Sequence, residues 1–131
     1  MTSRRCMVLE QGACEQLRLH GYKVRIIPTG NDRRLPPAHL VACRSGETRY
    51  IRIYKLSYRP ATIDTVEQYF SRVILRYRTE MARHPDAPIR YECWLYRLKH
   101  GYHCFEILPD RILEIPPTGK LPVHILVEGT P

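Results

Sequence analysis

The sequence predicts one α/β domain in which helices flank a mixed β-sheet. At 131 residues the chain is long enough for one hydrophobic core and short for two, since domains take roughly 100–200 residues each. Hydrophobic residues make up 44% and charged residues 26%, the balance of a folded globular protein. The hydrophobic periodicities follow the order α-β-β-β-α-β-β, and helices at these two positions can cover the faces of one sheet.

The first segments predict a helix and then a strand. Over about residues 6–20, apolar residues recur at spacings of three and four, which is typical of one face of a helix. These residues are Cys6, Leu9, Ala13 and Leu17. Gly21 is a C-terminal stop for this helix, and the β-forming segment Tyr22–Pro28 is predicted as a strand. A polar, basic loop then leads to two prolines.

Two hairpins and a long helix complete the predicted order. His39–Arg44 and Arg49–Leu56 flank a short turn that contains glycine, so they are predicted to form an antiparallel hairpin. Ile63–His84 is predicted as a helix because its apolar residues again recur every three or four positions. Arg90–Arg97 and Tyr102–Leu108 are predicted as the second hairpin.

The predicted domain covers residues 1–108, and residues 109–131 form a C-terminal tail. The tail is rich in proline but contains the apolar run Val123–Val127. This run leaves two roles open, an edge strand or a contact in a homodimer.

The basic charge is concentrated in one part of the sequence. The formal net charge is +8, yet residues 1–17 carry two basic and two acidic side chains, and residues 60–131 carry nine of each. The whole excess therefore lies in residues 18–59. Seventeen of the 21 basic residues are arginine, whose planar fork suits phosphate oxygens. The predicted nucleic-acid-binding residues are Arg25, Arg33, Arg34, Arg44, Arg49, Arg52, Lys55 and Arg59.

Tyrosines lie between these basic residues, at Tyr50, Tyr54 and Tyr58. Tyrosine and arginine side chains stack on bases or bind phosphate, which adds to the prediction of a nucleic-acid partner. The other interpretation of the same stretch is a basic surface that binds an acidic protein.

Neither a signal peptide nor a membrane segment is predicted, so we expect a cytoplasmic protein. The five cysteines are odd in number and show no CxxC spacing. They are predicted to be reduced, buried thiols.

The element order and several local motifs resemble the PD-(D/E)XK nuclease superfamily, and most closely the archaeal Holliday-junction resolvase type. The family has a glutamate in its first helix about three turns before a Gly-aromatic pair, and Glu10 stands at this distance from Gly21-Tyr22. A basic loop then leads to Pro-Asp and a hydrophobic strand in the family, which resembles residues 35–44 here, with His39 at the aspartate position. The Glu-x-Lys motif of the next strand reads Ile53-Tyr54-Lys55.

The departures from the family lie at the residues that carry its chemistry. The resemblance implies that the family's aspartate and glutamate bind a divalent metal, which activates water and stabilises the phosphoryl transition state. His39 and Ile53 occupy these two positions, and an isoleucine side chain has no oxygen to bind Mg²⁺. Glu10 and Lys55 are retained, and we expect them to pair with each other as a remnant of the site.

The sequence therefore predicts a restriction-endonuclease-like domain without catalytic residues, cofactor or metal, in which Glu10, His39, Ile53 and Lys55 form a degenerate site. Its predicted function is to bind nucleic acid, with DNA preferred to RNA, through residues 18–59. Two alternatives stay open: a protein-interaction or scaffold subunit, and a metal-free ribonuclease that uses His39 and Lys55 as acid and base.

Overall fold

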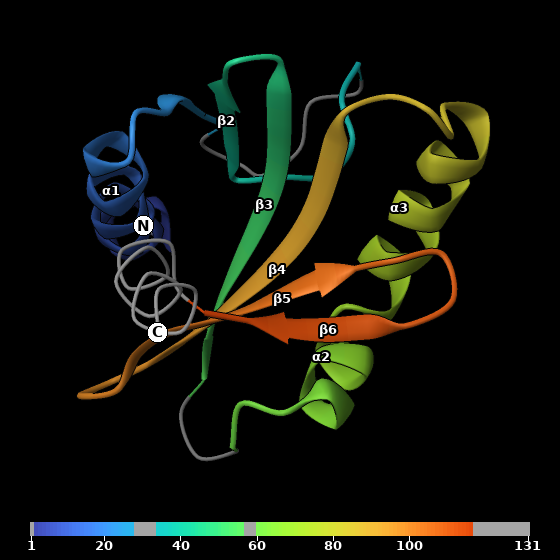
Figure 1. The fold of residues 1–131 in the computed structure, drawn as a ribbon. Helices are drawn as coiled ribbons and strands as arrows, with labels where there is room; N and C mark the ends of the chain where they lie inside the picture. Colours follow the sequence, from blue (N-terminus) through green and yellow to red (C-terminus); the bar gives the residue numbers. More distant parts are fainter. Residues whose placement is uncertain (1, 28–33, 57–59, 117–131) are drawn as a thin grey trace, which may run out of the picture.

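The chain folds as an α/β domain in which helices flank one six-stranded mixed sheet, as predicted (Figure 1). The computed structural model describes residues 2–27, 34–56 and 60–116, with side chains from Leu9 onward. The elements are α1 (Thr2–Leu19), β1 (Lys23–Ile26), β2 (Leu40–Arg44), β3 (Glu47–Leu56), α2 (Ile63–Tyr69), α3 (Ser71–Arg83), β4 (Ile89–Arg97), β5 (Gly101–Ile107) and β6 (Ile112–Ile115).

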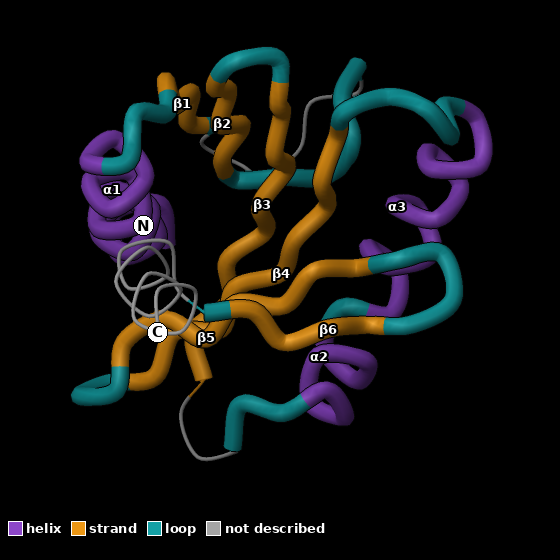
Figure 2. The backbone as a smooth tube through the Cα atoms, viewed as in Figure 1, coloured by secondary structure: helices purple, strands orange, loops and turns teal. Residues whose placement is uncertain are grey.

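The six strands lie in the sheet in chain order, β1 to β6 (Figure 2). All neighbouring pairs are antiparallel except β3 and β4, which are parallel. A parallel pair needs a crossover connection, and α2 and α3 supply it. The arrangement is broadly consistent with the restriction-endonuclease-like fold.

The structure differs from the prediction in two places. The long helix is interrupted at Phe70 (φ −113°, ψ 21°), whose ring is buried in the core between the ends of α2 and α3. The segment predicted as a tail begins with an edge strand, because β6 pairs antiparallel with β5. The apolar run Val123–Val127, for which an edge strand or a dimer contact was predicted, lies outside the described residues.

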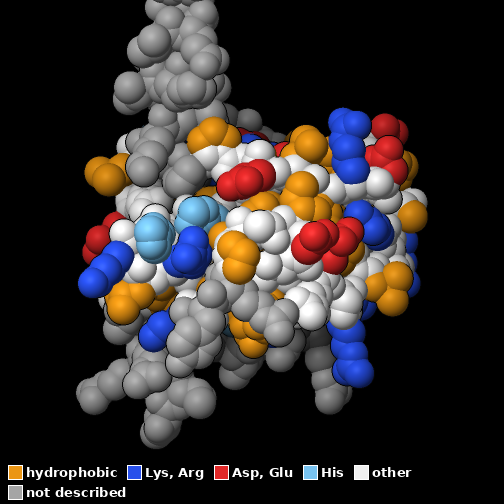
Figure 3. Space-filling view, turned by 90° about the horizontal axis from the view of Figure 1, so that it is seen from below, with side chains coloured by type: hydrophobic (Ala, Val, Ile, Leu, Met, Phe, Trp, Pro, Cys, Tyr) orange, Lys and Arg blue, Asp and Glu red, His pale blue; other side chains and the backbone are white. Residues whose placement is uncertain are grey.

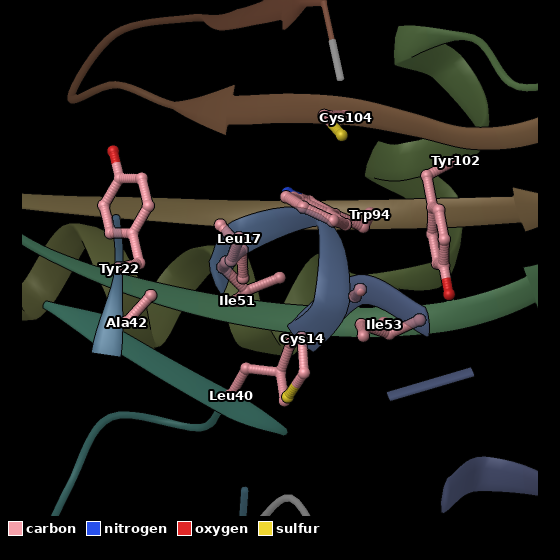
Figure 4. Packing of buried hydrophobic residues seen from close by; sticks show 11 residues of the cluster. Cys14, Leu17, Tyr22, Leu40, Ala42, Ile51, Ile53, Trp94, Tyr102 and Cys104 are labelled. Carbon is pink, nitrogen blue, oxygen red and sulfur yellow. The ribbon is translucent and has the colours of Figure 1, made fainter. Parts of the chain in front are cut away.

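One core lies between α1 and the sheet (Figure 4). Ala13, Cys14 and Leu17 form the buried stripe of the helix, and Ile51 and Trp94 face them from β3 and β4. The helix lies so close to the sheet at Gly12 that a Cβ atom there would lie 2.7 Å from the Tyr102 hydroxyl oxygen. A larger residue at position 12 would therefore require the Tyr102 side chain or α1 to shift.

A second core lies on the opposite face, beneath α2 and α3. Val66, Phe70, Ile74 and Tyr77 form the buried side of these two helices. They pack on side chains of β3, β4, β5 and β6, which are Leu56, Tyr91, Cys93, Leu95, Phe105, Ile107 and Ile112. The sheet is thus the middle of three layers, with α1 on one side and α2 and α3 on the other (Figure 1).

The α1 face of the sheet also contains a buried ion pair. The Arg49 guanidinium donates two hydrogen bonds to the Glu92 carboxylate, from Nε at 2.7 Å and from Nη2 at 2.6 Å. Trp94 Nε1 donates a third at 2.9 Å, and Arg90 Nε lies 3.5 Å from the same carboxylate. Glu92 is fully buried, so its charge depends on these donors.

We expect Arg49→Met to destabilise the fold by about 3–5 kcal/mol, because it leaves the Glu92 charge buried without its main partner. The double variant Arg49→Met with Glu92→Leu removes both charges and should recover most of this loss. Urea unfolding of the two variants and the wild type would measure the difference. A double variant no more stable than Arg49→Met would contradict the assigned role of the pair.

Candidate nucleic-acid interface and degenerate metal site

Glu10 is a buried carboxylate on the sheet side of α1. It shares the sheet-facing stripe of α1 with Ala13, Cys14 and Leu17, and only 1% of it is exposed. Neither of its oxygens has a hydrogen-bond partner among the described residues. Burial therefore raises the pKa of Glu10 to about 7.

His39 joins the loop before β2 to the central strand. His39 directly precedes β2, which begins at Leu40. Its ring Nδ1 accepts a hydrogen bond from the Ile53 backbone N–H of β3 at 2.9 Å. The ring nitrogen thus takes the place of a strand carbonyl on that side of β3. Burial, together with the charge of Arg52, lowers the pKa of His39 to about 4. His39 is therefore neutral at physiological pH, with its remaining proton on Nε2.

The other two positions of the predicted site lie on the same face of β3 but differ in exposure. Ile53 is part of the α1 core, whereas Lys55 is exposed at the end of the strand. The predicted pairing of Glu10 with Lys55 is wrong, since both Glu10 oxygens lack a partner in the described part of the chain. The reason is that Glu10 is buried on the sheet side of α1, whereas Lys55 is exposed.

These residues do not fit the divalent metal that the family resemblance implies. The Ile53 side chain offers no donor atom, and His39 Nδ1 is already occupied by a backbone N–H. Within the described residues no three His, Cys, Asp or Glu side chains lie close enough together to hold a metal ion. Mg²⁺ prefers six oxygen ligands, and Glu10 is the one carboxylate among the four positions.

The same geometry disfavours His39 as a general acid–base group. A base with a pKa near 4 accepts protons poorly at neutral pH, and one of its two nitrogens makes a structural hydrogen bond. Among the residues compared with the family site, Lys55 is thus the one charged group open to solvent.

The predicted nucleic-acid-binding residues differ in their exposure to solvent. Arg25, Arg34, Arg44 and Lys55 are exposed, and Arg52 is partly buried. Arg49 lies in the interior, contrary to the prediction, because Glu92 holds it there. Arg33 and Arg59, like Tyr58, lie outside the described residues.

Strand alternation divides these side chains between the two faces of the sheet. Arg44 and Lys55 lie on the α1 face, where Arg44 donates to the His20 carbonyl at 2.7 Å and stacks over Tyr22. Arg25 lies on the opposite face, since it pairs with Val41, which pairs with Tyr50. Figure 3 likewise shows basic side chains interspersed with acidic and hydrophobic ones rather than in one block.

We define the basic face by Lys23, Arg25 and Arg52 on the α3 side of the sheet, together with the exposed Arg34 in the segment before Pro37. Lys23 and Arg25 alternate with the inward residues of edge strand β1. Arg34 is exposed in the segment before Pro37, whose carbonyl accepts a hydrogen bond from Tyr77 of α3. Arg52 lies close enough to Tyr77 that its charge opposes the rise in the pKa of Tyr77 that burial causes.

The sequence analysis missed one feature beside this face, a pair of exposed tyrosines. The rings of Tyr54 on β3 and Tyr69 on α2 lie 4.9 Å apart, with an interplanar angle of 32°. Alternation along β3 was sufficient to place Tyr54 on the α3 side. Tyr69 carried no such signal, because its partner lies 15 residues earlier in the chain.

We expect Glu10→Gln to stabilise the protein at pH 8 and to have little effect at pH 5. The folded-state pKa of Glu10 is raised above its unfolded value of 4.5, so the folded state loses stability as the pH rises from about 4.5 to about 7, where only the unfolded state gives up the proton. The gain at pH 8 should be up to about 3 kcal/mol. Urea midpoints of both proteins at the two pH values measure it, and equal differences at pH 5 and pH 8 would contradict the assignment.

Comparison with known proteins does not assign the chain to a family. No protein-family model matches it, and no curated protein matches its sequence. No helix in the described ranges is long and apolar enough to cross a membrane.

Proposed function

We propose that this domain binds nucleic acid through the basic face, and that it is a nuclease-like domain in which the metal-binding carboxylates have been replaced. The resemblance to the Holliday-junction resolvase type, together with the helix and strand order, supports the second part. DNA is the preferred partner on the same grounds.

The observation that carries the proposal is the concentration of the excess basic charge in residues 18–59, part of which forms the basic face. Residues 18–59 contain the whole excess of +8 and only two acidic residues, Asp32 and Glu47. Glu47, the acidic residue of this stretch that the structure describes, lies on the α1 face. There it contacts Arg90 at 3.2 Å and the Tyr22 hydroxyl at 3.1 Å. Glu47 therefore lies across the sheet from Lys23.

Arginine and lysine side chains in this arrangement bind phosphates without reading sequence. Each neutralised phosphate of duplex DNA releases about 0.9 counterion, so the affinity should fall steeply with salt. Because the basic face lies on the α3 side, the replaced site beneath α1 does not take part in this contact.

We expect the double variant Lys23→Gln with Arg25→Gln to weaken duplex DNA binding by about ten-fold or more and to flatten its salt dependence. Lys99→Gln with Arg111→Gln removes the same charge from turns beside β5 and should leave affinity within about two-fold. Fluorescence anisotropy at several salt concentrations measures both. Salt-insensitive binding, or preference for an acidic polypeptide over DNA, would favour a scaffold role instead.

We expect no cleavage of branched or linear DNA when Mg²⁺ or Mn²⁺ is added, since Ile53 provides no ligand. Gel analysis of labelled substrates would show this. Turnover that Lys55→Ala abolishes would contradict the proposal. RNA cleavage in EDTA that His39→Ala abolishes would instead identify the metal-free ribonuclease.

A further inference from the structure

We infer that the Tyr54–Tyr69 pair is a stacking platform for an unpaired base, so that this domain binds single-stranded nucleic acid or an unpaired region of branched nucleic acid. This inference rests on the proposed function and specifies its substrate. It depends on three properties of the pair: its exposure, its rigidity and the charge beside it.

The two rings are unusually accessible for neighbours in contact. Tyr54 is 43% exposed and Tyr69 is 39% exposed, although their centroids lie only 4.9 Å apart. A pair of this kind in a core would leave far less surface to solvent. Here the rings cover one another in part and leave aromatic surface uncovered, which a flat aromatic ligand can occupy.

The platform is held in place from below. Tyr54 meets Phe70 edge to face at 5.7 Å and 74°, and Phe70 is 2% exposed within the α2–α3 core. Phe70 follows Tyr69 directly, and its backbone N–H donates to the Val66 carbonyl at 2.9 Å. Phe70 thus supports the Tyr54 ring directly, and Tyr54 in turn contacts the Tyr69 ring, so little ordering of the rings is needed when a base binds.

Basic side chains continue from the platform along α3. The Ile74 N–H donates to the Phe70 carbonyl at 2.8 Å, so helical spacing is carried across the interruption. Arg72 and Arg76 follow Tyr69 by three and seven residues, which places them on the same side of the helix. Both are exposed. They can contact the phosphates of a strand whose base lies on the rings.

The occupant is an unpaired base because paired bases offer no free ring face. In a duplex both faces of each base are covered by neighbouring base pairs, whereas in a single strand a base can leave the stack and lie on an aromatic side chain. The basic face alone would bind duplex and single strand alike. The tyrosines are therefore expected to contribute to single-strand affinity only.

The test compares fluorescein-labelled oligo(dT) of about 12 nucleotides with a duplex of equal length, by anisotropy on the full chain. Tyr54→Leu and Tyr69→Leu keep apolar bulk but remove the ring, and each should weaken oligo(dT) binding by about five-fold to a hundred-fold. Duplex affinity should change less than about two-fold. Tyr69→Phe keeps the ring and should bind as the wild type does, as should Leu75→Ala, a change at an exposed apolar residue elsewhere on α3.

Each result distinguishes the inference from the proposed function. Leucine variants that bind oligo(dT) like the wild type, or that lose duplex and single strand equally, overturn the platform while the basic face stands. Failure of the wild type to bind either nucleic acid overturns both proposals. Thermal unfolding monitors folding, and Tyr69→Leu decides the matter if Tyr54→Leu unfolds, since the Tyr54 ring makes the contact with Phe70.

Discussion

Strand β3 determines how the functional surfaces of this protein are arranged, because successive side chains of a strand point to opposite faces. Arg49, Ile51, Ile53 and Lys55 point toward α1, whereas Tyr50, Arg52, Tyr54 and Leu56 point toward α2 and α3. The strand lies inside the sheet, so both sets of residues must suit their own core. A shift of register by one residue would exchange the two sets and bury Arg52 beneath α1.

Two buried glutamates on the α1 side show how much the local partners matter. Glu92 receives hydrogen bonds from Arg49 and Trp94 and has Arg90 beside it, so its charge is compensated at full burial. Glu10 is buried to nearly the same degree, yet has no partner within the described residues, and burial raises its pKa to about 7. The surroundings of Glu10 therefore suit the protonated form of the acid.

The position of the basic face separates binding from the replaced site. Lys23, Arg25 and Arg52 lie across the sheet from Glu10, and the Tyr54–Tyr69 pair lies on the same side as these basic residues. The proposed binding therefore does not depend on the residues around Glu10. Phe70, at the interruption of the helix, connects the core to the surface. Its buried ring is part of the α2–α3 core and also supports the exposed tyrosine pair through Tyr54.

The sequence by itself determined the α/β class, both hairpins, and the absence of an oxygen donor at position 53, because periodicity and residue type are local properties. It also placed the excess charge in residues 18–59. Only the tertiary structure decided which of those charges reach solvent. The sequence predicts an exposed Arg49, but its ion pair with Glu92, 43 residues later in the chain, holds it in the interior. The same holds for the helix interruption, the edge strand β6 and the pairing of Tyr54 with Tyr69. Each depends on contacts between segments that are distant in the chain. The spacing of residues along the sequence does not show which distant segment packs against them.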